Sequence, residues 1–260
     1  GLQILGHEFA GWVVASDQAD VPVGTPVAVC PGAPCGACRA CSAGRANLCA
    51  ARSVLGYDLP GGMAELVAVP VDWIRTGGVV ALDPARPIES GALVEPLHTV
   101  LNGQDQARIA AGDRVLVMGL GPIGILHVTS ARSRGAAPVI GVDPDRGRVA
   151  AAGRVLGAHD LEAMDDTWRD RVRARVDGGG FDVVVVAVGS RQALADALDL
   201  AEPGGRVLAF AGMAPGSPTL DVDMNVLHYR QLSIVGSFGG TPAHFRRAAA
   251  WLEEQPFDVA

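Results

Sequence analysis

The sequence predicts an α/β protein in which a β-rich first part precedes a doubly wound parallel sheet. Two observations carry this prediction. Val115 to Asp143 has the pattern of a buried strand, a glycine-rich turn, a helix and a second strand that ends on an acid. Upstream of it, four cysteines cluster among short alternating runs and turns. From Gly112 onward, strand-like and helix-like segments alternate, as a doubly wound sheet requires.

The turn after Val115–Met118 has the spacing G-x-G-x-x-G, made by Gly119, Gly121 and Gly124. In such a turn the first glycine allows the tight bend, and the second lets backbone approach a pyrophosphate. The third lets the helix pack closely on the strand. Pro122 suits the first helical turn, and the free N–H groups there favour an anion. The segment therefore predicts a dinucleotide site.

Asp143 closes the next strand, near the separation of roughly 20 residues expected for an acid that binds a ribose 2′-hydroxyl. Because a carboxylate there repels a 2′-phosphate, NAD is predicted in preference to NADP. The cofactor is expected along the carboxyl ends of the strands. The predicted cofactor-binding residues are Gly119, Gly121, Pro122, Ile123, Gly124, Asp143, Arg148, Gly189, Gly212 and Ser237.

The cysteines Cys35, Cys38, Cys41 and Cys49 have the spacing C-x2-C-x2-C-x7-C. Four thiolates this close can form a tetrahedron around one zinc ion. A site closed by four sulfurs leaves no open position, so it is predicted to be structural. Cys30 lies outside the spacing and is interpreted as an ordinary half-buried thiol.

Composition excludes several classes of function. The net charge of −7 argues against nucleic acid or an anionic membrane surface as a partner. All 21 basic residues are arginine, so lysine chemistry is excluded. The uncharged run Val115 to Ala131 is shorter than the ~20 residues of a membrane span and contains three glycines and a proline. No signal peptide is recognisable, and clustered cysteines suit a reducing, cytoplasmic location.

Two further segments contain candidate site residues. Gly6-His7-Glu8 precedes the alternating run Phe9 to Ala15, so both polar side chains can reach one metal from a loop; the alternative is a buried His paired with its neighbour. Glu95 lies among apolar residues of a helical pattern from Pro87 to Gln106, where a carboxylate needs a charge partner or a raised pKa. His98, one turn further on, is either substrate-facing or a packing residue.

The remaining segments are predicted from their apolar patterns. Gly61 to Val69 is predicted as a turn and a strand, and Gly77 to Asp83 as a connector. Six strands are predicted for the doubly wound sheet, at 115–118, 139–142, 158–161, 181–188, 206–212 and 232–237.

Taken together, the segments GHEFAG, PCGACRACSAGRANLC, VEPL, VLVMGLGPIG, VIGVD, PGGRVLAFAG and LSIVGSFGG resemble the zinc-dependent medium-chain dehydrogenases of the alcohol dehydrogenase superfamily. The polyol, sorbitol and threonine dehydrogenase branch is the most similar. The resemblance implies a GroES-like catalytic domain over residues 1–97, with a zinc lobe at 30–50, followed by a Rossmann domain over 98–260. It also implies a homodimer or homotetramer.

The resemblance further implies a catalytic zinc, for which His7, Glu8 and Glu95 match the family's ligand positions. The family's cysteine ligand comes from a Cys-Gly-x-Asp segment upstream of Gly-His-Glu, and the sequence contains no such segment. The chain also stops at Phe257–Ala260, where another strand is expected. We therefore expect a fragment that lacks the C-terminal return to the catalytic domain.

The function implied by the resemblance is oxidation of a secondary alcohol to a ketone by hydride transfer to NAD. Polyols, sugar alcohols, cyclitols and hydroxy amino acids are candidate substrates. Two alternatives stay open: a catalytically incomplete, NAD-binding protein stabilised by zinc, and a zinc-free quinone or enone reductase of the same superfamily. The retained Gly-His-Glu and the four-cysteine lobe argue against the second alternative.

Overall fold

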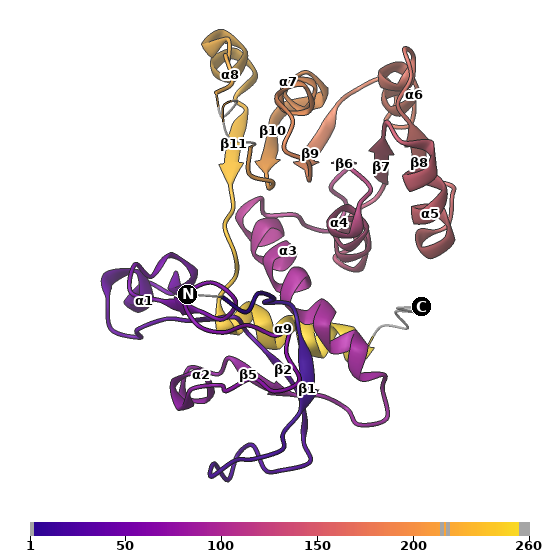
Figure 1. Cartoon of the computed structure of the whole chain (residues 1–260). Helices are drawn as coiled ribbons and strands as arrows, with labels where there is room; N and C mark the ends of the chain where they lie inside the picture. Colours follow the sequence, from indigo (N-terminus) through magenta and orange to yellow (C-terminus); the bar gives the residue numbers. More distant parts are fainter. Residues whose placement is uncertain (1–2, 214–215, 217–218, 255–260) are drawn as a thin grey trace. The chain divides into compact units, whose positions relative to one another are not determined.

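The computed structural model describes residues 3–213, 216 and 219–254, and its contacts divide the chain into two compact units (Figure 1). Unit 1 comprises Gly1–Asn102 and Phe238–Ala260, and unit 2 comprises Gly103–Ser237. This division differs from the predicted one. The helix α3 (Val94–Gln106) continues through the predicted boundary at residue 98, and the stretch from Phe238 onward belongs to unit 1. The strand expected near Phe257–Ala260 lies outside the described residues.

Unit 2 is built on a six-stranded parallel sheet with the strand order β11-β10-β9-β6-β7-β8. Read along the chain, this is the order 3-2-1-4-5-6 of a dinucleotide-binding sheet, so the predicted doubly wound fold is confirmed. The strands are β6 (Val115–Met118), β7 (Val139–Asp143), β8 (Leu161–Ala163), β9 (Phe181–Val186), β10 (Ala201–Ala209) and β11 (Ser233–Gly236).

Alternation along these strands directs side chains to two separate apolar cores. Leu116, Met118 and Val184 face one core, which α6 (Trp168–Ala174) and α7 (Arg191–Leu200) cover. Val115 and Val117 face the other core, which α4 (Pro122–Ser133) and α5 (Arg146–Leu156) cover. Because both faces of the sheet are covered, its strands read as continuous apolar runs.

Local signals place the helix starts in unit 2. The Asp145 carboxylate accepts hydrogen bonds from the backbone N–H groups of Gly147 and Arg148, which begins α5. The Ser190 hydroxyl accepts from the N–H of Ala193 and begins α7. A third such cap is Asp223, at the start of α8 (Met224–Arg230).

Unit 1 contains two small antiparallel sheets. One has the order β1-β2-β5, from Ala10–Trp12, Pro26–Val29 and Val79–Ala81, and the other pairs β3 (Gly32–Ala33) with β4 (Ser53–Val54). The short helical elements are α1 (Arg39–Ser42), η1 (Ala46–Leu48), α2 (Val71–Arg75) and η2 (Ile88–Leu93). Two predictions were wrong here: residues 61–69 form no strand, and the expected connector at 77–83 contains β5.

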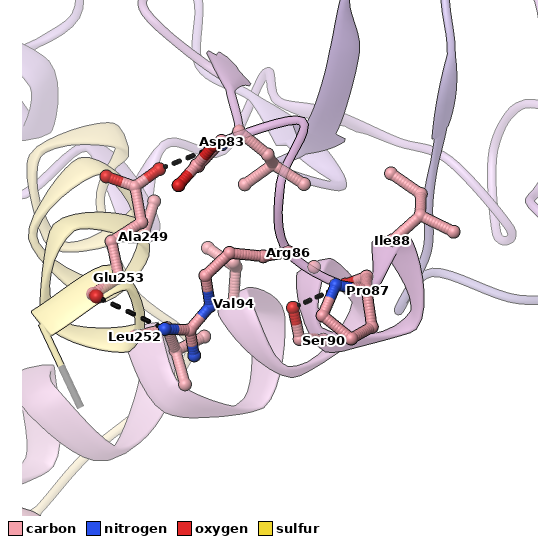
Figure 2. A pocket seen from close by; sticks show the side chains of 11 residues that line it. Asp83, Arg86, Pro87, Ile88, Ser90, Val94, Ala249, Leu252 and Glu253 are labelled. Carbon is pink, nitrogen blue, oxygen red and sulfur yellow. Dashed lines mark hydrogen bonds between the residues drawn. The ribbon is translucent and has the colours of Figure 1, made fainter. Parts of the chain in front are cut away.

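The last described helix, α9 (Pro242–Glu254), belongs to unit 1 and buries one apolar face. Its C-terminal end is attached to the segment before η2, around a small cavity of about 20 Å³ (Figure 2). The backbone N–H of Asp83 donates to Glu253 Oε1 at 3.2 Å, and Arg86 Nη1 donates to the carbonyl oxygen of Glu253 at 3.3 Å. The chain therefore does return to the unit that contains its N-terminal residues, contrary to the prediction.

Over the described part of the chain, no helix combines the length and the apolar character that crossing a lipid bilayer requires.

Candidate functional site

The side chains of His7, Glu8 and Glu95 converge in unit 1, although the third is far from the first two in sequence. Each offers one ligand atom, and these atoms all lie within 4.8 Å of one another. Imidazole nitrogen and carboxylate oxygen are ligands that zinc accepts, and three protein ligands leave a fourth position open for a substrate. The three side chains therefore form a group that could hold a metal ion.

Glycines hold the His7 loop in place. The backbone carbonyl of Gly6 accepts a hydrogen bond from the N–H of Gly62 at 2.8 Å, and Ile4 O accepts from Gly61 at 2.9 Å. A Cβ atom added at Gly61 would lie 2.2 Å from the carbonyl oxygen of Gly6, so no other residue fits there. The segment that was predicted as a turn and a strand therefore serves to position the Gly-His-Glu loop.

Glu95 lies in the first turn of α3 and is only 8% exposed. Burial, and secondly the negative charge of Glu8, raises the pKa of its carboxyl to about 8. Two carboxyl groups held together with one of them buried are a donor set that a divalent cation stabilises. The cluster therefore fits the metal that the sequence predicted.

His98 is not one of the three residues of this group. Its ring packs against α9 and also lines the cavity that adjoins the cluster, so the structure agrees with both of its interpretations. Its ring is 3% exposed and lies edge-on to Phe245 of α9, with centroids 5.4 Å apart. Its Nδ1 contacts the backbone oxygen of Glu95. Burial lowers the pKa of this imidazole to about 4, so it is neutral at physiological pH.

A cavity of about 570 Å³ adjoins the cluster within unit 1. His7 and Glu95 line it, together with polar residues that sequence reasoning missed: Asn47, Arg52, Tyr57 and Asp58. The ring of Tyr57 stacks at a tilt on His7, with centroids 5.3 Å apart. Asn47 lies inside the cysteine lobe and the other three follow it, without a spacing of their own that would mark them.

The four cysteines that are predicted to bind zinc also lie close together. Their sulfur atoms lie within 4.8 Å of one another, and Cys38 Sγ is 3.5 Å from Cys41 Sγ. The backbone N–H groups of Ala37 and Cys38 lower the pKa of the Cys35 thiol to about 6, which favours the thiolate that a metal binds. Cys30 lies outside this group and is more buried than predicted, at 2% exposed.

In unit 2, the glycine-rich turn has the geometry of a phosphate-binding loop. A Cβ atom added at Gly124 would lie 1.8 Å from the carbonyl oxygen of Gly119, so the helix α4 can pack this closely only with glycine there. Gly121 is the N-cap of α4 and has open space around it, and Pro122 and Ile123 form the first turn. The loop thus presents free backbone N–H groups at a helix start, where a pyrophosphate fits.

Asp143 is 1% exposed and lies directly beneath this turn. Its Oδ2 accepts from the N–H of Leu120 at 2.8 Å, and its Oδ1 accepts from the N–H of Asp145 at 2.8 Å. Arg148 Nη1 is 3.9 Å from Oδ2, and its side chain is 61% exposed. The predicted ribose acid is therefore also a structural support of the loop.

The other predicted cofactor residues lie at the carboxyl ends of β9, β10 and β11. A Cβ atom added at Gly189 would lie 2.4 Å from the carbonyl oxygen of Gly212, so these two glycines are neighbours. The Ser237 hydroxyl oxygen is buried and has no hydrogen-bond partner among the described residues. Such an orphaned buried group fits a site that a polar ligand completes.

A doubly wound sheet with a glycine-rich turn in one unit, and two clusters of metal-binding side chains in the other, are the parts of a metal-dependent dehydrogenase. Comparison with known proteins leads to the same class of protein. A model of the zinc-binding dehydrogenase family matches residues 122–254, and a model of the alcohol dehydrogenase GroES-like domain matches residues 3–77. The chain belongs to the zinc-binding dehydrogenases.

Relatives and solved structures extend this result. L-galactonate-5-dehydrogenase of Escherichia coli (strain K12) is 31% identical over 97% of this chain and 72% of its own length. L-threonine 3-dehydrogenase of Chelativorans sp. (strain BNC1) is 33% identical over 99% of this chain and 73% of its own. A Sinorhizobium meliloti 1021 protein solved with NADP superimposes with a TM-score of 0.87 at 32% identity, covering 99% of this chain and 74% of the other. The chain is accordingly a zinc-dependent, NAD(P)-linked oxidoreductase of alcohols.

Proposed function

We propose that His7, Glu8 and Glu95 hold the catalytic zinc and that the cavity beside them receives a secondary alcohol bearing several polar groups. The convergence of these three side chains, from a loop and from the start of α3, is the observation that carries the proposal. Unit 1 is then the catalytic unit, and unit 2 holds the dinucleotide.

When bound, zinc supplies Lewis-acid chemistry that acidifies an alcohol, and the nicotinamide accepts a hydride. The chain's own residues prepare this chemistry. His7 contributes an imidazole nitrogen, while Glu8 and Glu95 contribute negative charge that offsets the charge of the cation. The backbone N–H groups after Gly119 hold the pyrophosphate, and Asp143 orients that turn and disfavours a 2′-phosphate.

The substrate class is drawn from both the cavity and the relatives. Asn47, Arg52 and Asp58 give the cavity wall amide, guanidinium and carboxylate groups, which suit hydroxyl-rich molecules. The named relatives act on a sugar acid and on a hydroxy amino acid. A polar secondary alcohol, such as a polyol or hydroxy acid, is consistent with both.

The proposal also includes a homo-oligomeric state and a cytoplasmic location. The edge strand β11 exposes Ile234 at 44%, and an exposed apolar edge supports a homodimer or homotetramer. The five cysteines are unpaired by disulfides, which supports a reducing, cytoplasmic compartment.

Replacement of His7 tests the metal assignment in the full-length protein. We expect His7→Ala to lower bound zinc from about two ions per chain to about one, because the cysteine lobe keeps its own ion. Turnover should be lost while the Kd for NAD stays near the wild-type value. Elemental analysis and cofactor fluorescence titration measure both quantities, with the exposed His228→Ala as the matched control. Unchanged zinc content, or loss of NAD binding, would contradict the assignment.

A further inference from the structure

Arg52 lies on the wall of the cavity, between the cysteine lobe and β4. Its guanidinium carbon is 4.7 Å from the centroid of the Phe238 ring, and its Nη1 donates to the backbone oxygen of Asn47 at 2.9 Å. The Asn47 side chain donates in turn to the backbone oxygen of Phe238 at 2.8 Å. The three residues form a closed set, which holds the guanidinium in one orientation.

This cation has no acidic partner to neutralise it. None of the ion pairs among the described residues includes Arg52, and its side-chain hydrogen bond to the backbone oxygen of Asn47 occupies one of its five N–H donors. A guanidinium presents parallel pairs of donors that match the two oxygens of a carboxylate or a phosphate. A half-buried, pre-oriented guanidinium on a cavity wall is therefore suited to bind an anion.

Arg52 and two residues of the metal-binding cluster, His7 and Glu95, line the same cavity. Its volume of about 570 Å³ is typical of small-ligand sites. Burial raises the pKa of the Cys30 thiol to about 12; of the smaller contributions, the charge of Glu95 raises this pKa and that of Arg52 lowers it. Because Arg52, His7 and Glu95 line one cavity, a ligand bound there has both a cation and the metal-binding cluster in its wall.

We propose that Arg52 binds an anionic group of the alcohol substrate, a carboxylate or a phosphate ester, while the reacting hydroxyl lies at the His7–Glu8–Glu95 cluster. This inference rests on the proposed function and narrows its substrate class to hydroxy acids or phosphorylated polyols. A neutral polyol brings no counter-charge of its own to the guanidinium, whereas an anion pairs with it through two hydrogen bonds.

The test compares matched substrates in the full-length, zinc-loaded protein with NAD. C5 and C6 aldonates, the alditols of the same stereochemistry, and the corresponding alditol phosphates are assayed, and kcat/KM for each anion is divided by kcat/KM for its alditol. We expect this ratio to fall by about 10- to 100-fold in Arg52→Gln, and by less in Arg52→Lys, which keeps the charge but not the paired donors. Arg45→Gln, an exposed lobe arginine outside the cavity, should keep the wild-type ratio.

Each outcome has a distinct meaning. A ratio that depends on Arg52 only for aldonates identifies a carboxylate, and one that depends on it only for the phosphates identifies a phosphate ester. If Arg52→Gln lowers the turnover of anions and alditols equally, or the wild type prefers alditols, the inference is overturned.

A second measurement separates this inference from the proposed function. If no alcohol of the panel is oxidised, the proposed function fails, but calorimetric titration of aldonate and alditol phosphate still reports the anion site. A weaker Kd in Arg52→Gln than in Arg45→Gln then supports the inference, and equal Kd values overturn it. Thermal unfolding of each variant verifies that the fold is retained.

Discussion

At the scale of single residues, Asp143 supports the glycine-rich turn and is also the acid that is predicted to contact a ribose. Its sequence position predicts contact with a ribose, and its two oxygens accept the backbone N–H groups of Leu120 and Asp145. A carboxylate has about four lone-pair positions, so these two bonds do not use all of them. The acid can therefore shape the turn and select the cofactor at the same time.

Asp143→Asn tests the cofactor preference. Removing the charge while keeping one acceptor oxygen should weaken discrimination against NADP, shifting the ratio of the Kd values for NADP and NAD by about 10-fold. Fluorescence titration with both cofactors measures the ratio. Asp170→Asn changes an exposed acid on α6 and serves as the control. An unchanged ratio in Asp143→Asn would argue against the role of the acid in selection.

A second buried residue, His127, makes the stability of the protein depend on pH. Its ring is fully buried under Phe210, with centroids 4.5 Å apart, and Gln104 donates to its backbone oxygen at 2.9 Å. Burial lowers the pKa of the imidazole from 6.5 to about 3. The unfolded chain therefore takes up a proton below about pH 6.5 that the folded protein does not, and stability falls as the pH drops from 6.5 towards 3.

His127→Met removes this proton uptake. When the pH is lowered from 7 to 5, the free energy of unfolding of the wild type should fall by about 2 kcal/mol more than that of the variant. Urea titration at both pH values measures the difference. His228→Gln, on the exposed surface of α8, should show no such relative gain. Parallel pH profiles of His127→Met and the wild type would rule out a neutral buried imidazole.

At the scale of elements, the sequence predicts best where apolar patterns are continuous. The predicted strand 115–118 is β6 to the residue, and 139–142 falls short of β7 by only Asp143. Their side chains are buried on both faces, so the pattern has one reading. The prediction failed at 61–69 and 77–83. The first segment is an irregular loop that bonds to the His7 segment, and the second contains β5, which pairs with β2. In both cases the partner is distant in the sequence.

The helices α1 and η1 of the cysteine lobe bury no residue, so we predict that a bound zinc ion stabilises this element. We expect Cys38→Ser to lower bound zinc by about one ion per chain and to open the lobe to trypsin at the exposed Arg39 and Arg45. Elemental analysis and timed proteolysis with mass spectrometry detect both changes. Cys30→Ala, outside the cluster, should keep the zinc content and the resistance to cleavage. A lobe that stays intact in Cys38→Ser would show that other contacts order it.

At the scale of the whole molecule, the two compact units are not two consecutive stretches of sequence, because α9 belongs to the same unit as the N-terminal residues. The resemblance implied a nucleotide-binding domain over residues 98–260, which would include α9. In the structure its apolar face packs in unit 1, and Glu253 bonds the segment at Asp83 and Arg86 (Figure 2). A hydrophobic face predicts that one side of a helix is buried, but it does not predict which surface the helix packs against.

The same limit applies to the candidate site. The sequence by itself determined the doubly wound sheet, the glycine turn with its acid and the four-cysteine lobe, because in each the residues that cooperate are close in the chain and have a fixed spacing. Only the tertiary structure decided that Glu95 lies within 4.8 Å of His7 and Glu8, that His98 packs against Phe245, and that Arg52 lines the same cavity. These contacts join segments far apart along the chain, and their distances follow from how separate elements pack rather than from any local pattern.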